Sequence, residues 1–269
     1  GHALKKKNER AAGRPGGVQG RAAAPLPSAG RHGEALRLAD QVFIFKRTVR
    51  EAALKHGIGA TFMAKPISGE PGSSMHIHQS LTDAKSGANL FSNKDGSASN
   101  LFYNYIGGLQ TYIPQMMPIF APNVNSYRRY LPGANGNAPV NIEWGEDNRT
   151  VGLRVPKASP AARRVENRLP GADTNPYLTL AGNLLCGYLG MTQDLKPRKP
   201  VQYRMGGEAD ETVPWNLEAA LDEMASSEVI RDALGTKFVD GFVATRWAEY
   251  EGFKRVISSW ERQYLLATV

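Results

Sequence analysis

Apolar and small residues recur at three- or four-residue spacing between residues 35 and 56, which is the spacing of one helix face. The set comprises Ala35, Leu38, Val42, Phe45, Val49, Ala52 and His56. Gly57 follows directly, and glycine often ends a helix because it adopts the left-handed conformation without a steric penalty. The pattern therefore predicts an amphipathic helix over residues 35–56.

Short segments bounded by glycine, proline and other turn residues read as strands. They cover residues 60–65, 74–81, 140–144, 150–155 and 163–169. The connections between them are a glycine-rich turn over 68–73, a polar loop over 82–99 and a turn-like stretch over 145–148. The strands thus fall in the first two thirds of the chain.

Longer apolar segments predict helices. Residues 101–117 are one, although Gly107, Gly108 and Pro114 weaken it. Asn175 and Pro176 form a favoured helix start, a capping residue followed by proline in the first turn, and that helix runs through Tyr188. After a loop over 196–214, helices are expected over 217–235 and 237–266. Strands first and helices last predict an α+β fold, with helices packed against an antiparallel sheet.

The first 31 residues differ in composition from the rest. Residues 1–32 contain Lys5, Lys6, Lys7, Arg10, Arg14, Arg21 and Arg31 against Glu9 alone, so they carry 7 − 1 = +6 of the net charge of +8. Such a stretch buries too little apolar surface to offset its ordering entropy. We expect residues 1–31 to be a disordered basic tail and residues 32–269 to be one domain. The tail could bind nucleic acid through phosphates, but the nearly neutral domain argues against that function.

Composition excludes several classes of protein. No apolar run approaches the roughly 18–20 residues that cross a bilayer. Cys186 is the single cysteine, so there is no disulfide framework and no four-cysteine zinc site. The basic start is not followed by the apolar segment of a signal peptide. We therefore expect a cytoplasmic protein.

Two histidines lie on one face of the strand predicted over 74–81. Side chains two residues apart in a strand share a face, so His76 and His78 point the same way as Ser74 and Ser80. Two imidazoles on a polar face can bind a metal ion or contact a phosphate-bearing ligand. They can equally be hydrogen-bonded histidines without a ligand, and the motif alone leaves both readings open.

The strand predicted over 163–169 presents a carboxylate between two guanidinium groups. Alternation puts Arg164, Glu166 and Arg168 on one face. Such a pattern is either a structural salt-bridge ladder or part of a site for anions. Arginine binds carboxylates and phosphates through two parallel hydrogen bonds, and several more arginines lie nearby: Arg128, Arg129, Arg149, Arg154 and Arg163. Together with the two histidines, they favour a site for a nucleotide, an anionic substrate and a divalent cation, where charge neutralisation assists phosphoryl transfer.

At these residues the sequence resembles a known family. The stretch from Gly72 to Leu81, GSSMHIHQSL, is similar to a motif of the glutamine synthetase catalytic domain. So are NSYRR at 125–129, NR at 148–149 with RVP at 154–156, and RRVENR at 163–168 with NPY at 175–177. The motifs follow the family order, and the resemblance covers about residues 31–269.

The resemblance implies a metal and a catalytic arginine. His76 and Glu166 match ligands of a divalent ion, Mg²⁺ or Mn²⁺, that bridges the phosphates of the nucleotide. Arg149 matches the catalytic arginine that meets the transferred phosphoryl group. Glutamate-binding positions are matched by Gly72, Arg129 and Arg168, and nucleotide-binding positions by His78, Ser80, Arg154 and Arg164.

The implied activity is that of an ATP-dependent ligase. In the family, ATP phosphorylates the side-chain carboxylate of glutamate and an amine then displaces phosphate, in a site closed to water. Intact members are homo-oligomers of stacked rings. The implied partners are therefore glutamate, ATP and an amine, with no membrane.

Two departures from the family pattern affect these expectations. No acidic residue occurs between Gly133 and Ile142, where members that use ammonia carry a glutamate, so a bulkier amine is expected, as in the γ-glutamylpolyamine synthetase branch. The family also has an N-terminal β-grasp domain and further metal-binding glutamates before the position of Arg31, whereas residues 13–30 contain no carboxylate. We expect this chain alone to lack most ligands of the first metal and to have little or no synthetase activity. The alternative is a family member that binds nucleotide without turnover.

Overall fold

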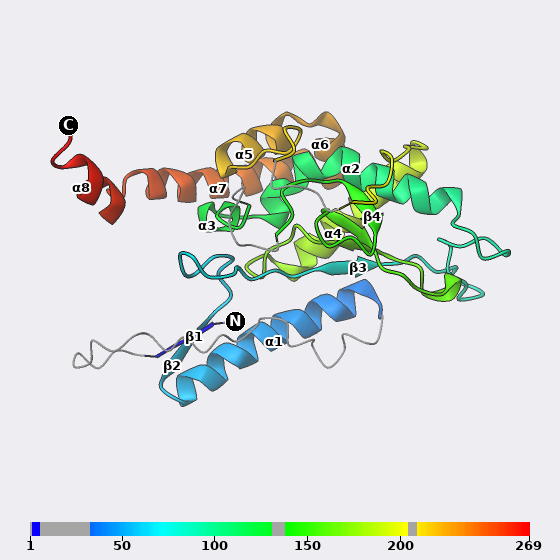
Figure 1. Ribbon diagram of the computed structural model, residues 1–269, viewed down its shortest axis with the longest axis horizontal. Helices are drawn as coiled ribbons and strands as arrows, with labels where there is room; N and C mark the ends of the chain where they lie inside the picture. Colours follow the sequence, from blue (N-terminus) through cyan, green and yellow to red (C-terminus); the bar gives the residue numbers. More distant parts are fainter. Residues whose placement is uncertain (1, 6–32, 131–137, 204–208) are drawn as a thin grey trace.

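The computed structural model describes residues 2–5, 33–130, 138–203 and 209–269. Within these ranges the chain has the predicted α+β architecture, with a small sheet beside a layer of helices (Figure 1). The strands are β1 (His2–Lys5), β2 (Ile58–Thr61), β3 (Ile77–Gln79), β4 (Trp144–Glu146), β5 (Leu153–Val155) and β6 (Val165–Asn167). In these parts of the chain, none of the helices combines the length and the apolar character needed to cross a bilayer.

The helices account for most of the regular secondary structure in the described ranges. They are α1 (Ala35–Lys55), α2 (Asn100–Phe120), α3 (Val124–Tyr127), α4 (Pro176–Thr192), α5 (Leu217–Ser226), α6 (Glu228–Leu234), α7 (Thr236–Lys254) and α8 (Ser259–Leu265), with a 3₁₀ turn at Pro160–Ala162. The polar loop predicted over 82–99 contains only isolated bridges between its own residues.

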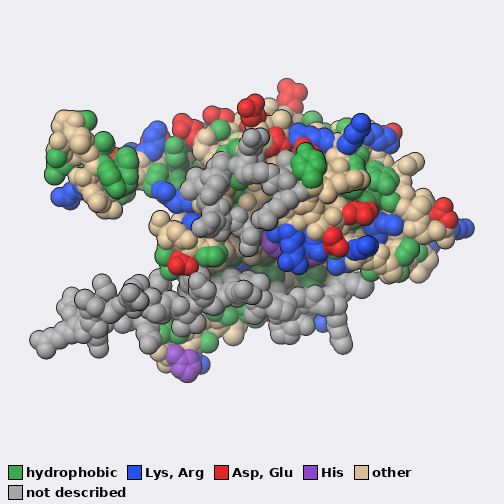
Figure 2. Space-filling model, in the orientation of Figure 1, with side chains coloured by type: hydrophobic (Ala, Val, Ile, Leu, Met, Phe, Trp, Pro, Cys, Tyr) green, Lys and Arg blue, Asp and Glu red, His purple; other side chains and the backbone are tan. Residues whose placement is uncertain are grey.

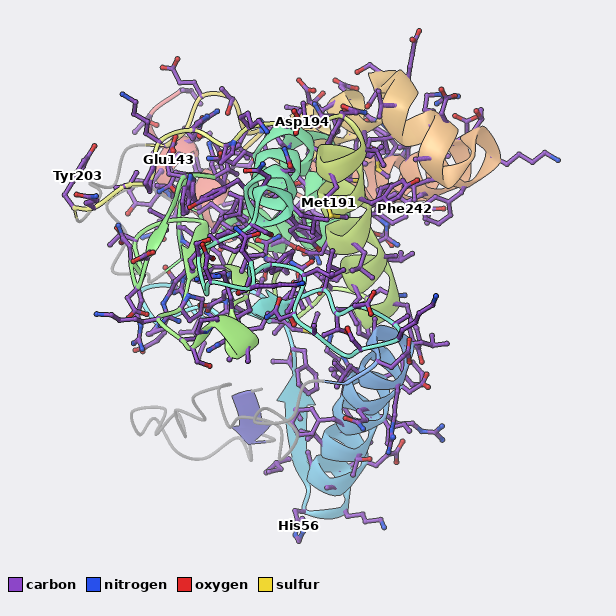
Figure 3. All side chains as sticks on the ribbon, turned by 90° about the vertical axis from the view of Figure 1, so that its right-hand side faces the viewer. His56, Glu143, Met191, Asp194, Tyr203 and Phe242 are labelled. Carbon is purple, nitrogen blue, oxygen red and sulfur yellow. The ribbon has the colours of Figure 1, made fainter. Side chains whose placement is uncertain are left out.

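Helix α1 confirms the first periodic pattern. The Glu34 carboxylate caps its start by accepting hydrogen bonds from the backbone N–H groups of Leu36 and Arg37 at 2.9 Å each. At the other end Gly57 adopts φ +68°, so glycine ends the helix as predicted. The helix extends below the other helices, with His56 at its far tip (Figure 3).

The main sheet has the strand order β3-β6-β5-β4. The pairs β3–β6 and β5–β6 are antiparallel, as predicted, but β4 runs parallel to β5. The predicted turn does not form at residues 145–146, because these residues continue β4. The chain then turns at Asp147, which has φ +46°, and loops through 148–152 to begin β5 beside the start of β4.

Other predicted boundaries also shift. The strand predicted over 60–65 lies at 58–61, and only 77–79 of the predicted 74–81 is a strand, with Ser74 forming a single bridge to Gly171. The helices predicted over 217–235 and 237–266 are each divided. Serines cause both breaks, because Ser227 and Ser258 are extended residues whose hydroxyls accept from N–H groups of the following helices.

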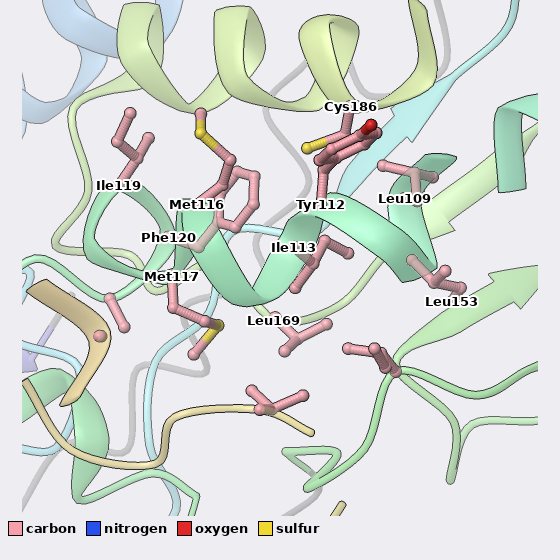
Figure 4. Close-up of a cluster of buried hydrophobic side chains, with 14 of the residues drawn as sticks. Leu109, Tyr112, Ile113, Met116, Met117, Ile119, Phe120, Leu153, Leu169 and Cys186 are labelled. Atoms are coloured by element: carbon pink, nitrogen blue, oxygen red, sulfur yellow. The ribbon is translucent and has the colours of Figure 1, made fainter. Parts of the chain in front are cut away.

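Helix α2 forms the centre of the core and packs against α4 and α5 (Figure 4). It continues through Pro114 and Pro118, since nearly all of its residues are buried and packing outweighs propensity. Glycines permit the close crossing with α4: a Cβ on Gly108 would lie 2.2 Å from the carbonyl oxygen of Cys186 and 2.6 Å from the Cα of Gly190. Cys186 is buried at this crossing, as expected of a core residue.

Most of the predicted basic tail lies outside the described residues. Within it, the backbone of His2–Lys5 pairs antiparallel with β2, His2 opposite Thr61 and Lys5 opposite Ile58. The expectation of a disordered tail over 1–31 therefore stays a prediction for the remaining positions.

Candidate active site on the sheet face

Three neighbouring strands align the principal charged residues. His78 on β3 is directly opposite Glu166 on β6, and Glu166 is opposite Arg154 on β5. Ile77 and Gln79, on either side of His78, are buried on the opposite face of the strand, as alternation predicts. Figure 2 shows basic side chains gathered next to a histidine near the middle of the molecule.

Glu166 is the centre of this arrangement. It is 2% exposed, and each of its carboxylate oxygens accepts from a different arginine: Oε2 from Arg154 Nη1 at 2.7 Å, and Oε1 from Arg168 Nη1 at 2.9 Å. Burial alone would raise the pKa of Glu166, but the hydrogen bond from Arg154 and the charge of Arg168 outweigh it and the pKa is lowered. The carboxylate is therefore ionised and held between two cations.

The two histidines occupy different environments. His78 Nε2 lies 3.9 Å from Glu166 Oε1, and Arg164 Nε donates to His78 Nδ1 at 3.3 Å. Burial lowers the pKa of His78 despite the nearby carboxylate. His76 contacts Ser74 Oγ at 3.4 Å through Nε2, and burial together with the charge of Arg168 lowers its pKa to about 4. Both imidazoles are consequently neutral at pH 7. The lone pair of His78 accepts from Arg164, whereas Nδ1 of His76 has no hydrogen-bond partner among the described residues.

The donor set fits a divalent cation in part. His76 Nδ1 is buried and has no hydrogen-bond partner in the described part of the chain, and the carboxylate of Glu166 is near enough to influence the pKa of His76. Neutral imidazole and carboxylate are ligands that Mg²⁺ and Mn²⁺ accept. The described ranges contain no group of three or more histidine, cysteine or acidic residues placed to hold a metal. The other ligands of such an ion would be phosphate oxygens and water.

Residues predicted to bind glutamate come together beside the charged strands. A Cβ on Gly72 would lie 2.9 Å from Cγ of Arg129, so only glycine lets the 72–73 backbone approach this arginine. Arg129 is 5% exposed, and its Nη1 donates to the carbonyl of Leu169 at 2.8 Å, next to Arg168. Gly72 thus contacts Arg129, and Arg129 contacts the residue after Arg168, while the role of the three in binding glutamate stays a prediction.

The remaining predicted residues lie at the rim. Arg149 is exposed, and its charge contributes, after burial and the charge of Arg154, to the lowered pKa of Arg168. Ser80 is exposed directly after β3, in alternation with His78. Arg128 is also exposed, next to the buried Arg129. The segment around Gly133, on which the prediction about the amine rests, falls at 131–137, outside the described residues.

Sequence reasoning missed one charged member of this site. Asp147 Oδ1 accepts from Arg154 Nη2 at 2.8 Å, so Arg154 bridges two carboxylates. Asp147 has φ +46°, a conformation that is uncommon for a residue other than glycine and often occurs near functional sites. The stretch GEDN was read only as a turn. The signal that could have identified it was an aspartate in a turn between two predicted strands, seven positions before Arg154.

Comparison with known proteins gives a consistent result. The family model for the glutamine synthetase catalytic domain matches residues 28–265. A glutamate–isopropylamine ligase from a Pseudomonas species is 38% identical over 236 residues, covering 86% of this chain and 51% of the relative. A glutamine synthetase from Methanocaldococcus jannaschii is 38% identical over 244 residues, covering 86% of this chain and 53% of that protein.

A solved structure described as apo GmaS without ligand has the same fold. It superposes with a TM-score of 0.77 and 33% identity, over 87% of this chain and 54% of the other. The present chain therefore spans about half the length of the relatives that it matches.

Proposed function

The chain belongs to the glutamine synthetase family, and we propose that it carries the catalytic site of an ATP-dependent ligase that joins glutamate to an amine. The observation that carries this proposal is Glu166, buried between Arg154 and Arg168 and aligned with His78 across three strands. Such a row of fixed cations suits a reaction in which negative charge moves between phosphate and carboxylate groups. We further propose that the protein acts in the cytoplasm.

The proposed nucleotide side of the site consists of His78, Ser80, Arg154 and Arg164. The two arginines offer guanidinium groups to phosphate oxygens, and His78, which is neutral, is oriented by its contact with Arg164. A divalent ion held by His76 and Glu166 would neutralise phosphate charge. Arg149, at the exposed rim, would move onto the transferred phosphoryl group as the site fills.

The proposed glutamate side consists of Gly72, Arg129 and Arg168, which would bind the carboxylates of the substrate. An oxygen of the side-chain carboxylate attacks the terminal phosphorus of ATP, the bond from phosphorus to the bridging oxygen breaks, and ADP leaves. The amine lone pair then attacks the activated carbonyl carbon, phosphate leaves, and the amine loses a proton. The arginines stabilise the charge that develops at both steps.

For the acceptor we propose an amine bulkier than ammonia, such as a polyamine. The support is the lack of an acidic residue between Gly133 and Ile142, together with 38% identity to a relative named for isopropylamine. This stretch therefore has no acidic residue equivalent to the glutamate that binds and deprotonates ammonium in other members of the family.

The test is phosphate release from ATP with Mg²⁺, glutamate and one amine at a time. We expect release that requires both glutamate and the amine, with kcat/KM higher for isopropylamine or spermidine than for ammonium. Arg149→Gln should lower kcat at least about 100-fold, the effect of losing one transition-state donor. Release that is independent of glutamate, or unchanged in Arg149→Gln, contradicts the proposal.

A second candidate function is nucleotide binding without turnover. It is favoured by the two arginine bonds to Glu166, since they neutralise that carboxylate without a metal ion. In that case calorimetry would detect ATP binding that Arg164→Gln weakens, while no phosphate is released with any amine. The two candidates therefore give opposite results in the same assay.

A further inference from the structure

A large cleft lies outside the sheet-face site, between α1, the start of α4 and the first turns of α7. Its volume is about 920 Å³, and none of the ten residues proposed above for catalysis or binding lines it. Figure 3 shows α1 below α4, with Phe242 of α7 on the same side of the molecule. We call this feature the cationic cleft, after five of its lining residues: Lys46, Arg47, Arg50, Lys237 and Arg246.

Positive charge in the cleft is only partly compensated. Its carboxylates are Glu51 and Asp173, against five basic side chains. Oδ2 of Asp173 accepts from Asn123 at 2.9 Å and from Ser126 at 2.6 Å, whereas its buried Oδ1 has no hydrogen-bond partner among the described residues. Arg246 pairs with Glu249 at 2.7 Å, but its buried Nε has no hydrogen-bond partner.

Three cations of α1 have no carboxylate partner. Lys46, Arg47 and Arg50 form no ion pair with any residue of the described ranges. Lys46 Nζ donates to the carbonyl of Thr174 at 2.7 Å, which satisfies one of its three donors. Burial, helped by the charge of Arg50 and opposed by Asp173, lowers the pKa of Lys46 to about 8. Burial is therefore what disfavours the ammonium, and a bound anion beside Lys46 would stabilise its charged form.

Five aromatic rings from the described part of the chain also line the cleft. Lys46 Nζ and the guanidinium carbon of Arg50 lie 5.8 Å and 5.1 Å from the centre of the Phe62 ring. Phe43 packs on Tyr177 with ring centres 6.3 Å apart, and Phe238 stacks on Phe242 at 5.9 Å. Rings beside cations suit a ligand with a flat apolar body and a charged end.

We propose that the cationic cleft binds an organic anion, namely a carboxylate or phosphate group attached to an aromatic ring system. The charged end lies against Lys46 and Arg50, and the ring lies among Phe43, Phe62 and Phe242. A bare inorganic anion leaves the aromatic surface exposed, and an uncharged ring leaves the cations uncompensated. Both parts of the ligand are therefore required.

The test is titration of the full chain, followed by calorimetry, with four probes that separate these requirements. Naphthoate and naphthyl phosphate have both parts, inorganic phosphate has only the charge, and naphthol has only the ring. At least one of the first two should bind about tenfold more tightly than either control, and the better one identifies the charged group. Added salt should weaken binding.

Substitutions locate the binding. Arg50→Gln should weaken the better probe about tenfold, the typical value of one charge-assisted contact. Lys55→Gln removes a charge from the exposed end of the same helix and should have no effect. His78→Ala, in the sheet-face site, should also leave the affinity unchanged.

A measurement on the unsubstituted chain makes the result independent of folding of the variants. The better probe should protect Lys46, but not Lys55, from an amine-acylating reagent, as read by mass spectrometry of peptides. The proposal is overturned if neither aromatic anion binds at millimolar concentration, if naphthol binds equally well, or if His78→Ala rather than Arg50→Gln abolishes binding.

Discussion

The sheet-face site and the cationic cleft use the same residue types in opposite states of compensation. On the sheet, Glu166 holds Arg154 and Arg168 within 2.9 Å, so the cations are fixed before any ligand arrives. In the cleft, Lys46 and Arg50 face aromatic rings rather than carboxylates. The basic side chains of this chain are thus organised in two ways. On the sheet, a carboxylate fixes the guanidinium groups in place, whereas in the cleft Lys46 and Arg50 form no ion pair with a described residue.

The largest expected effect comes from removing the central carboxylate. Glu166→Gln leaves Arg154 and Arg168 beside a neutral amide in a buried position. Breaking one partner out of a buried charge network costs about 3–5 kcal/mol. We therefore expect the free energy of unfolding, measured with urea, to fall by that amount.

The matched control lies in the cleft. Glu51→Gln removes a carboxylate that forms no ion pair with a described residue, and it should change the free energy of unfolding by less than about 0.5 kcal/mol. Equal losses in the two variants would abolish the distinction between a compensated and an uncompensated surface.

The sequence could predict which side chains share a strand face, but not which strands pair or in which register. Alternation correctly placed His78 with Ser80, and Glu166 with Arg168, because period-two geometry is local. It could not supply the register between strands, and the register is what puts Arg154 opposite Glu166.

The cleft was outside the reach of sequence patterns altogether. Lys46 lies 128 positions from Thr174, whose carbonyl it contacts, and no local period links α1 to α7. The parallel pairing of β4 with β5 was missed for a similar reason. The chain turns at Asp147, which has a left-handed backbone conformation, and returns to the start of β4 before β5 begins. Residue type alone does not predict this path.

A smaller effect, with a pH signature, is expected at Lys46. The pKa is about 8 in the folded chain against 10.5 for an ordinary lysine. Below pH 8 both states are protonated, and folding must bury the charge at a cost of up to about 3 kcal/mol. Between pH 8 and 10.5 the unfolded chain binds more protons, so stability from this residue rises with pH.

Lys46→Met should remove that dependence. We expect the variant to be more stable than the parent at pH 7 by up to about 2 kcal/mol, once the lost bond to Thr174 is allowed for. The advantage should shrink toward pH 10. Lys55→Met, at the exposed end of α1, serves as the control and should follow the parent at both pH values. Urea midpoints at pH 7 and 10 decide the matter, and a constant difference would contradict the assigned burial.

Two glycine substitutions, the second of which has the smallest expected effect, distinguish the two regions by how closely the backbone is packed. In Gly72→Ala the new Cβ would lie 2.7 Å from the carbonyl oxygen of Ala64 and 2.9 Å from Arg129 Cγ. The backbone must therefore shift, and we expect the free energy of unfolding to fall by about 1–3 kcal/mol. In the cleft, the ideal Cβ of Gly241 has nothing within 4 Å. Gly241→Ala should therefore stabilise α7 by about 0.5–1 kcal/mol through helix propensity. Thermal unfolding measures both variants. Opposite signs support a tightly built glutamate side and an open cleft, whereas a destabilising Gly241→Ala would mean that the cleft is filled by protein.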